Sequence, residues 1–232
     1  LADERHLTFI HPFDDLDVAT GQGTIAMEIV QELPTVDYIL VPVGGGGLVT
    51  GVSTLAKMLN PKIKVIGVEP KNAASMTEAL KNDGPVTLPS ANTIADGTAV
   101  KRVGTKIFPY CKENIAQMLT VDDSRLIGAF LNMVENHKMI VENSGLLPVA
   151  ALDQLDLKGK KAVLVLSGGN MDVITMSSVV QHGLIQQDRI FTVSVLLPDK
   201  AGELVKVAAA IADQNGNVIK LEHNQFVSIN RN

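Results

Sequence analysis

The sequence predicts an α/β fold, a doubly wound and mostly parallel sheet, followed by a partial α+β unit of βαβ order. Strand-like apolar runs alternate with helical stretches along residues 1–183, and this alternation favours parallel pairing through right-handed crossovers. Hydrophobic residues make up 46% of the 232 residues and aromatic residues only 3%, so the core must consist mainly of aliphatic side chains. Buried parallel strands and their covering helices have that composition.

The individual elements follow from apolar periodicity and from capping residues. Buried strands are expected at residues 37–43, 62–70 and 161–167, with a short strand at 7–10. Helices are expected at 19–33, 48–59, 144–155 and 170–181 and from Asp122 or Asp123 to about 137, while 83–105 is mostly loop.

The pattern changes near Gly183, where a polar connection begins. Residues 191–197 alternate like a strand, 203–214 form an amphipathic helical pattern, and a second strand is expected after Gly216. We therefore predict two domains, 1–183 and 190–232. A sheet of two strands with one helix is too small to be stable alone, so the second domain is expected to be incomplete.

Composition excludes several functional classes. A net charge of −5 argues against a nucleic-acid interface, which needs a basic patch. No apolar run reaches the roughly 18 residues of a membrane span, and no signal-peptide pattern opens the chain. The single cysteine, Cys111, favours a reducing cytoplasm. Five scattered histidines give no metal-ligand spacing, and His11 before Pro12 is predicted to be a structural loop residue.

A run of four glycines is the most informative segment. Gly44, Gly45, Gly46 and Gly47 follow a predicted strand and precede a helix. Such a loop can direct backbone N–H groups at a phosphate, with the alternative that it is only a tight turn. It lacks the lysine of a nucleoside triphosphate loop. Glu69 follows at a distance that suits a dinucleotide site, but the glycine phasing of that fingerprint is absent.

A second glycine turn, Ser167 to Asn170, also lies at the carboxyl end of a predicted strand. Ligands of open α/β sheets bind beyond these ends, so the two turns predict one planar phosphorylated cofactor between them. The Ser167 hydroxyl can pair with an aromatic ring nitrogen without carrying charge. The alternative is that Ser167 caps the following helix.

Several ordered blocks together resemble a known family. IHPFDD, GQGTIAMEI, VPVGGGGLVTG, VIGVEP, TIADGTAV, VENSGLLPVAAL and VLSGGNMD are similar to fold-type II pyridoxal-phosphate enzymes, above all the threonine dehydratases (threonine ammonia-lyases), with serine dehydratase and serine racemase as relatives. The tail from Arg189 resembles the first half of an ACT domain. The resemblance covers essentially the whole chain.

This resemblance implies a cytoplasmic, homo-oligomeric enzyme that uses pyridoxal 5'-phosphate to convert L-threonine or L-serine into a 2-oxo acid and ammonia, as in isoleucine biosynthesis. Residues 44–47 would bind the cofactor phosphate, and Ser167 would bind the ring nitrogen. Glu142 would face the cofactor pocket, with a partly exposed carboxylate at the start of a helix as the alternative. Asp96 and Gly97 would line the substrate side.

Two further sites are implied by the same resemblance. Glu69 and Ala73 correspond to ligands of a divalent cation in some relatives. Ser75 stands where those relatives carry a carboxylate, which favours a hydrogen-bonding role for Glu69 over a metal. Asp199 and Gly202 lie in the turn where ACT domains hold an amino-acid effector, with an ordinary turn as the equal alternative.

The family binds its cofactor covalently through a lysine in a Ser-Phe-Lys motif, and this sequence contains no such motif. We therefore expect the chain to be the carboxyl-terminal two thirds of a dehydratase, with no catalytic residue of its own and no activity alone. The alternatives are a non-catalytic pyridoxal-phosphate or amino-acid sensor and, disfavoured by its glycine phasing, a dinucleotide-binding oxidoreductase domain.

Overall fold

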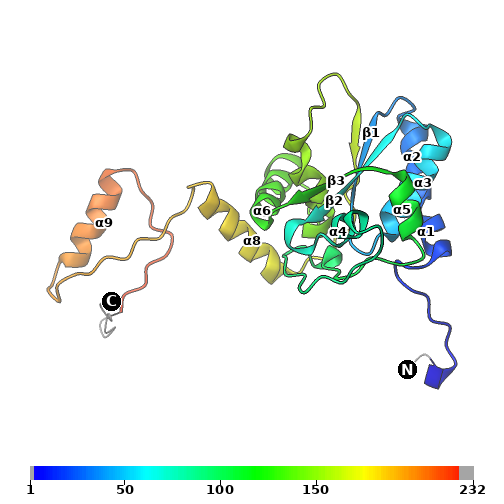
Figure 1. Cartoon of the computed structure of the whole chain (residues 1–232). Coiled ribbons are helices and arrows are strands. Elements are labelled where there is room, and N and C mark those ends of the chain that lie inside the picture. Colours follow the sequence, from blue (N-terminus) through cyan, green and yellow to red (C-terminus); the bar gives the residue numbers. More distant parts are fainter. Residues whose placement is uncertain (1–2, 225–232) are drawn as a thin grey trace. The chain divides into compact units, whose positions relative to one another are not determined.

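A computed structural model describes residues 3–224, and the chain divides into two units (Figure 1). The first unit runs from Leu1 to Ile190 and the second from Phe191 to Asn232. The first contains the sheet. The described part of the second contains one helix, α9 (Glu203–Asp213).

Four parallel strands form the sheet in the order β3-β2-β1-β4. Their bounds are β1 (Tyr38–Pro42), β2 (Lys64–Pro70), β3 (Ile115–Val121) and β4 (Ala162–Leu164). The central strand β1 aligns Tyr38 with Lys64 of β2 and with Ala162 of β4. Because all strands are parallel, their carboxyl ends lie along one edge of the sheet.

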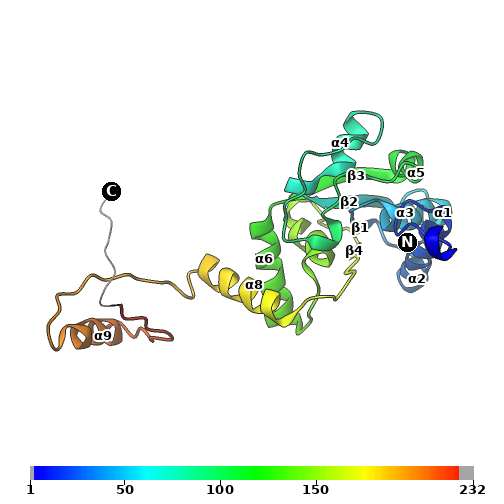
Figure 2. The same ribbon diagram turned by 90° about the horizontal axis from the view of Figure 1, so that it is seen from below.

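Helices cover both faces of the sheet, and alternate residues of β1 point into two different apolar cores (Figures 1 and 2). Ile39 and Val41 belong to one core and Leu40 to the other. The first core includes residues of α1 (Leu16–Gln22), α2 (Thr24–Glu32), α3 (Gly47–Leu59), α4 (Ser75–Lys81) and α5 (Phe108–Asn114). The second includes residues of α6 (Asp123–Asn132), α7 (Leu147–Ala150) and α8 (Val173–Gln186).

Short helical turns complete the unit. They are η1 (Asp3–Arg5), η2 (Lys71–Ala73), η3 (Asp96–Thr98), the π-helical η4 (Met133–His137), η5 (Asn143–Leu146) and η6 (Leu152–Gln154). Within the described residues, no helix is both long enough and apolar enough to cross a membrane.

The predicted α/β class is confirmed, together with the buried strands β1 and β2, the helix after the glycines and the helix that begins beyond Asp122. The buried strand expected at 161–167 is instead the three-residue, half-buried β4. The expected helix at 19–33 is two helices that meet at Gly23. The expected helix at 144–155 is mostly tight turns around α7. Helix α8 continues past Gly183 to Gln186, so the predicted connection begins later than expected.

The predicted strand at 7–10 is wrong, and one strand was missed. Leu7, Phe9 and Ile10 are exposed and form no strand, because none of the strands within residues 3–224 pairs with them. The missed strand β3 lies at one end of the sheet order, and its two adjacent exposed residues, Ala116 and Gln117, weaken the apolar signal.

The predicted βαβ unit of the tail is only partly found. Helix α9 confirms the expected helix, but residues 191–197 form no strand, and none is present from 217 to 224. The remainder of the expected second strand lies outside the described residues. Phe191, Val193 and Leu196 are exposed, and no strand among residues 3–224 pairs with this segment.

A close approach of helix α3 to the junction of α1 and α2 depends on Gly51. A Cβ atom there would overlap the carbonyl oxygen of Ala19 and lie 2.6 Å from the amide nitrogen of Gly23. Both neighbours are backbone atoms, so a side chain could be accommodated only by moving a helix.

We expect Gly51→Ala to lower the free energy of unfolding by about 1–3 kcal/mol, because the added methyl group forces α3 away from α1. The matched control is Gly128→Ala in α6, where no atom lies within 4 Å of an added Cβ. That change should be neutral or stabilise by up to about 1 kcal/mol. Urea unfolding of both variants measures the difference, and equal effects would contradict the packing argument.

Candidate functional site

The four glycines form a loop between β1 and α3 that is packed tightly on its protein side. A Cβ at Gly45 would overlap the ring of Phe13, and a Cβ at Gly46 would lie 2.5 Å from Cδ1 of Ile107. Gly46 also has a φ of 103°, in the left-handed region that favours glycine. Only glycine therefore suits the centre of this loop.

The loop has polar groups left for a ligand on its other side. The Gly45 carbonyl accepts a hydrogen bond from Gly104 N at 2.9 Å, and the Gly46 carbonyl accepts one from Thr50 N at 3.0 Å. Within residues 3–224, the N–H groups of Gly44, Gly45 and Gly46 donate to no protein atom. Free donors before a helix N-terminus suit an anion, as the phosphate hypothesis requires.

Successive contacts link the glycine loop to three further loops at the carboxyl edge of the sheet. A Cβ at Gly44 would lie 3.0 Å from Cα of Thr98, which places η3 beside the loop. A Cβ at Gly97 would lie 2.8 Å from Oε1 of Glu142, and one at Gly168 would lie 2.5 Å from the same oxygen. The predicted residues of four separate segments are therefore neighbours.

Glu142 connects two of these segments. Its Oε2 accepts a hydrogen bond from Asn170 N at 3.1 Å, and its own N–H donates to the Gly168 carbonyl at 3.3 Å. The residue directly precedes η5 and is half-buried, which agrees with the structural alternative. It holds the second glycine turn in place, so its position at the site does not depend on a cofactor.

Ser167 begins the second glycine turn and is half-buried. The helix-capping interpretation of Ser167 is wrong, because Asp172 accepts hydrogen bonds from Ile174 N and Thr175 N, both at 2.9 Å, and so caps α8. The backbone of Ser167 is fixed by close packing, since a Cβ at Gly145 would overlap its carbonyl oxygen. Its hydroxyl role stays a prediction.

The loop that carries Asp96 and Gly97 is exposed at these two residues. It is held by two residues that the sequence analysis did not assign to the site, Asp123 and Asn143. Asp123 accepts hydrogen bonds from Thr93 Oγ1 at 2.6 Å and from Ile94 N at 3.1 Å. Nδ2 of Asn143 donates to the Ile94 carbonyl at 3.0 Å. In the sequence, Asp123 is recognisable only as a residue at the start of a helix, so its hydrogen bonds to the 93–94 segment could not be predicted.

The segment before α1 supports the glycine loop, a role that the sequence analysis did not predict. Nδ1 of His11 accepts a hydrogen bond from Asp14 N at 2.9 Å, which confirms its structural role. Oδ1 of Asp14 accepts from Lys106 N at 2.7 Å. The IHPFDD block therefore holds the ring of Phe13 against the loop.

Glu69 is fully buried and serves the start of α4. Its carboxylate accepts hydrogen bonds from Met76 N at 2.6 Å, Thr77 N at 2.9 Å and Thr77 Oγ1 at 2.7 Å. Burial raises the pKa of Glu69 from 4.5 to about 7, against the opposing effect of these bonds.

The geometry around Glu69 matches the hydrogen-bonding role that Ser75 favours. The described residues contain no group of three His, Cys, Asp or Glu side chains that could hold a metal. The cation site at Glu69 and Ala73 stays a prediction. So does the effector site at Asp199 and Gly202, where Gly202 caps α9 with a φ of 90°.

Comparison with known proteins identifies similar chains. The family described as pyridoxal-phosphate dependent enzyme matches residues 1–168. L-threonine ammonia-lyases of Thermotoga maritima and Geobacter sulfurreducens are 39% and 41% identical over 94% and 96% of this chain, and over 54% and 56% of their own lengths. The chain thus spans about half the length of these relatives.

Solved structures agree with this relationship. Processed threonine deaminase isoform 2 from Solanum lycopersicum has a TM-score of 0.73 and 36% identity, over 78% of this chain and 54% of its own. Serine racemase from Dictyostelium discoideum has a TM-score of 0.68 and 36% identity, over 74% of this chain and 56% of its own.

Glu69 should give the stability of the protein a specific pH dependence. With a folded pKa near 7 and an ordinary value of 4.5, the folded state retains a proton that the unfolded chain loses. This contribution is complete below about pH 4.5 and is lost as the pH rises to 7. Glu69→Gln lacks it, so the stability of the variant relative to wild type should rise with pH.

Urea unfolding between pH 5 and 7.5 measures this difference. The control is Asp153→Asn, which changes an exposed carboxylate paired with Arg125 of α6. Its difference from wild type should stay nearly constant across the range. A constant difference for Glu69→Gln as well would contradict the raised pKa.

Proposed function

The chain belongs to the family of pyridoxal-phosphate dependent enzymes, and on this premise we propose that it forms one wall of the cofactor site in an ammonia-lyase acting on L-threonine or L-serine. The products would be a 2-oxo acid and ammonia. The names of the ammonia-lyase relatives support this reaction. A cytoplasmic location and a homo-oligomeric full-length enzyme belong to the same proposal.

One observation carries the proposal: successive contacts through η3 and Glu142 link two glycine turns at the same sheet edge. Gly44 lies beside the η3 segment, and Glu142 lies against both Gly97 and Gly168. A ligand between the turns would face free N–H groups on one side and Ser167 on the other. The residues present therefore fit a small phosphorylated ring compound better than an extended dinucleotide.

Each residue has a definite task in this proposal. Gly44 to Gly47 hold the phosphate through N–H groups, with added attraction from the N-terminus of α3. The neutral Ser167 hydroxyl orients the ring by bonding its nitrogen, which limits the charge that develops on the ring. Glu142 keeps the Ser167 turn in place, and Asp96 and Gly97 border the substrate. When bound, pyridoxal phosphate supplies an electron-withdrawing ring that stabilises negative charge at the substrate α-carbon.

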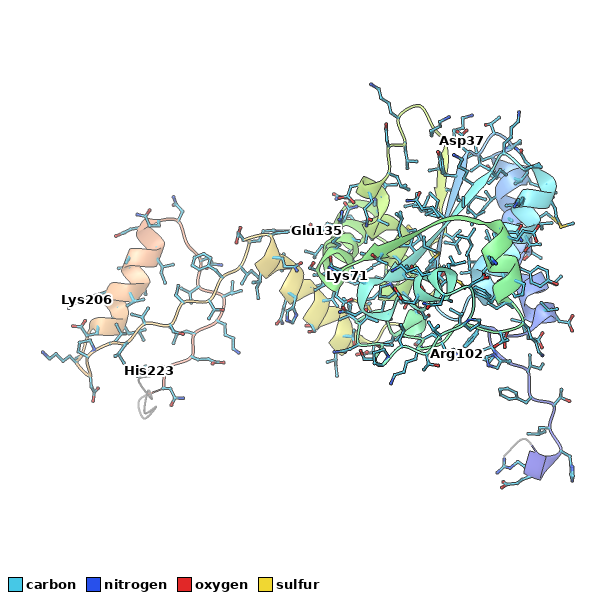
Figure 3. The ribbon with its side chains drawn as sticks, viewed as in Figure 1. Asp37, Lys71, Arg102, Glu135, Lys206 and His223 are labelled. Carbon is cyan, nitrogen blue, oxygen red and sulfur yellow. The ribbon has the colours of Figure 1, made fainter. Side chains whose placement is uncertain are left out.

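No lysine contact within residues 3–224 points to a covalent cofactor link. Lys71, labelled in Figure 3, forms an ion pair with Asp122 at 3.0 Å. Lys57 donates to the Glu113 carbonyl at 2.8 Å. Both ammonium groups are therefore occupied on exposed surface, and we propose no catalytic lysine for this chain.

Ser167→Ala should weaken pyridoxal 5'-phosphate binding by roughly 5-fold, because it removes one hydrogen bond to the ring nitrogen. Titration followed by cofactor absorbance measures the affinity. Ser178→Ala, which changes an exposed serine on α8, serves as the control. The loss should vanish with 1-deazapyridoxal 5'-phosphate, whose ring lacks the nitrogen. An equal loss for both ligands would refute the assigned role.

This chain alone should form no 2-oxo acid from L-threonine in the presence of pyridoxal 5'-phosphate, because catalysis needs a positioned amine nucleophile. Hydrazone formation with released 2-oxo acid provides the assay. The same chain should still bind the cofactor. Turnover that disappears in Lys57→Ala or Lys71→Ala would show that one of these lysines acts in catalysis, and absence of cofactor binding would overturn the proposed site.

A further inference from the structure

The carbonyl groups of the glycine loop are held on the side away from the proposed ligand. Gly104 N donates to the Gly45 carbonyl at 2.9 Å, and the Gly46 carbonyl is bound from α3. A trans peptide is planar, so its N–H points opposite to its C=O. Whatever holds the Gly46 carbonyl therefore also fixes the direction of the Gly47 N–H.

The side chain of Thr50 provides such a hold. Its Oγ1 donates to the Gly46 carbonyl at 2.7 Å, and the residue is only 4% exposed. Oγ1 also lies 3.0 Å from Sγ of Cys111 on α5. Because the hydroxyl has a single proton and uses it on Gly46, the thiol must be the donor to Thr50.

The state of Cys111 is consistent with this direction. Cys111 is fully buried, and burial raises the pKa of its thiol to about 12, so the thiol keeps its proton. Its Sγ also lies 3.9 Å from the Gly46 carbonyl oxygen. A continuous series of donors thus runs from α5 through Thr50 of α3 to the loop.

We propose that Thr50, held by Cys111, is a positioning residue that orients the Gly46–Gly47 peptide of the glycine loop for phosphate binding. The proposal rests on the proposed function and extends it to two residues outside the loop. They contact neither cofactor nor substrate. Their effect reaches the ligand through the Gly47 N–H.

A purely structural role would be the ordinary explanation for such a threonine. Threonine hydroxyls in helices often bond the carbonyl four residues back. Here, however, that carbonyl belongs to Gly46, the left-handed residue at the start of α3, and Thr50 N already completes the helical bond to it at 3.0 Å. The helical hydrogen bond is therefore complete without the hydroxyl, which adds a second restraint to the Gly46 carbonyl and so to the Gly47 N–H.

The test compares pyridoxal 5'-phosphate with pyridoxal, which lacks the phosphate. Thr50→Val keeps the shape of the buried side chain and removes the donor, so binding of the phosphorylated ligand should weaken roughly 5- to 10-fold while pyridoxal binding stays unchanged. Thr50→Ser should restore wild-type affinity. Cys111→Ala should cause a smaller loss in the same direction, and Cys111→Ser should recover it.

A second readout is independent of affinity. In protein labelled with ¹⁵N-glycine, the Gly47 amide signal of the ligand-free protein should shift in Thr50→Val and return in Thr50→Ser. An unshifted Gly47 signal, or a Thr50→Val loss that is equal for both ligands, would overturn the positioning role. If Thr50→Val does not fold, the Cys111→Ala and Cys111→Ser pair decides by the same criteria.

Failure of the proposed function gives a different result. Wild-type protein that binds pyridoxal as tightly as its phosphate would refute the phosphate site itself, and the positioning role with it. If instead Thr50→Val and Cys111→Ala prefer pyridoxal 5'-phosphate over pyridoxal as strongly as the wild-type protein does, only the role of these two residues is refuted.

Discussion

Close backbone approach at the four glycines is the constraint on which the arrangement of the site depends. Without side chains at these positions, the ring of Phe13, the side chain of Ile107 and the backbone of Thr98 can all lie against the loop. These contacts come from segments far apart in the sequence. The N–H groups of Gly44, Gly45 and Gly46 donate to no atom of the described residues, so they remain available to the proposed ligand.

Glycines also allow close approach of neighbouring atoms around Glu142. Gly97 and Gly168 admit its carboxylate between two loops, and Gly145 admits the backbone of Ser167. Glu142 then fixes the second turn through its bond from Asn170 N. These hydrogen bonds are enough to explain why a half-buried carboxylate occupies this position. In the proposed site, Glu142 would serve by holding the turn that begins at Ser167.

The sequence predicts strands best where nearly every residue of the strand is buried. β1 and β2 are buried almost throughout, so their continuous apolar runs could be recognised. The apolar pattern does not predict β3, which contains the exposed residues Ala116 and Gln117. It does predict a strand at the mostly apolar residues 7–10, where the structure has none. Apolar character alone does not specify pairing, which depends on a neighbouring strand. The tail fails for the same reason, because its strand-like residues have no partner in the described part of the chain.

The site residues divide along a similar line. The glycine turns could be predicted because each directly follows a strand, and neighbouring parallel strands present their carboxyl ends together. The contacts of Asp123 and Thr50 could not be predicted, because each depends on a partner that is distant in the sequence and that only the fold brings close. Helical propensity and capping already account for both residues, so no pattern in the sequence signals their second roles.

The strand order explains why the two glycine turns lie at the carboxyl ends of neighbouring strands, where one ligand is proposed to bind. From β1 the chain proceeds outward through β2 to β3 and then returns to place β4 on the opposite side of β1. The turn after β1 leads into α3 on one face, and the turn after β4 leads to α8 on the other. Adjacent strands whose connections leave to opposite faces create a crevice between their carboxyl ends, which is where open α/β sheets bind ligands. The position of the site thus follows from topology, while the glycines determine which chemical groups face into it.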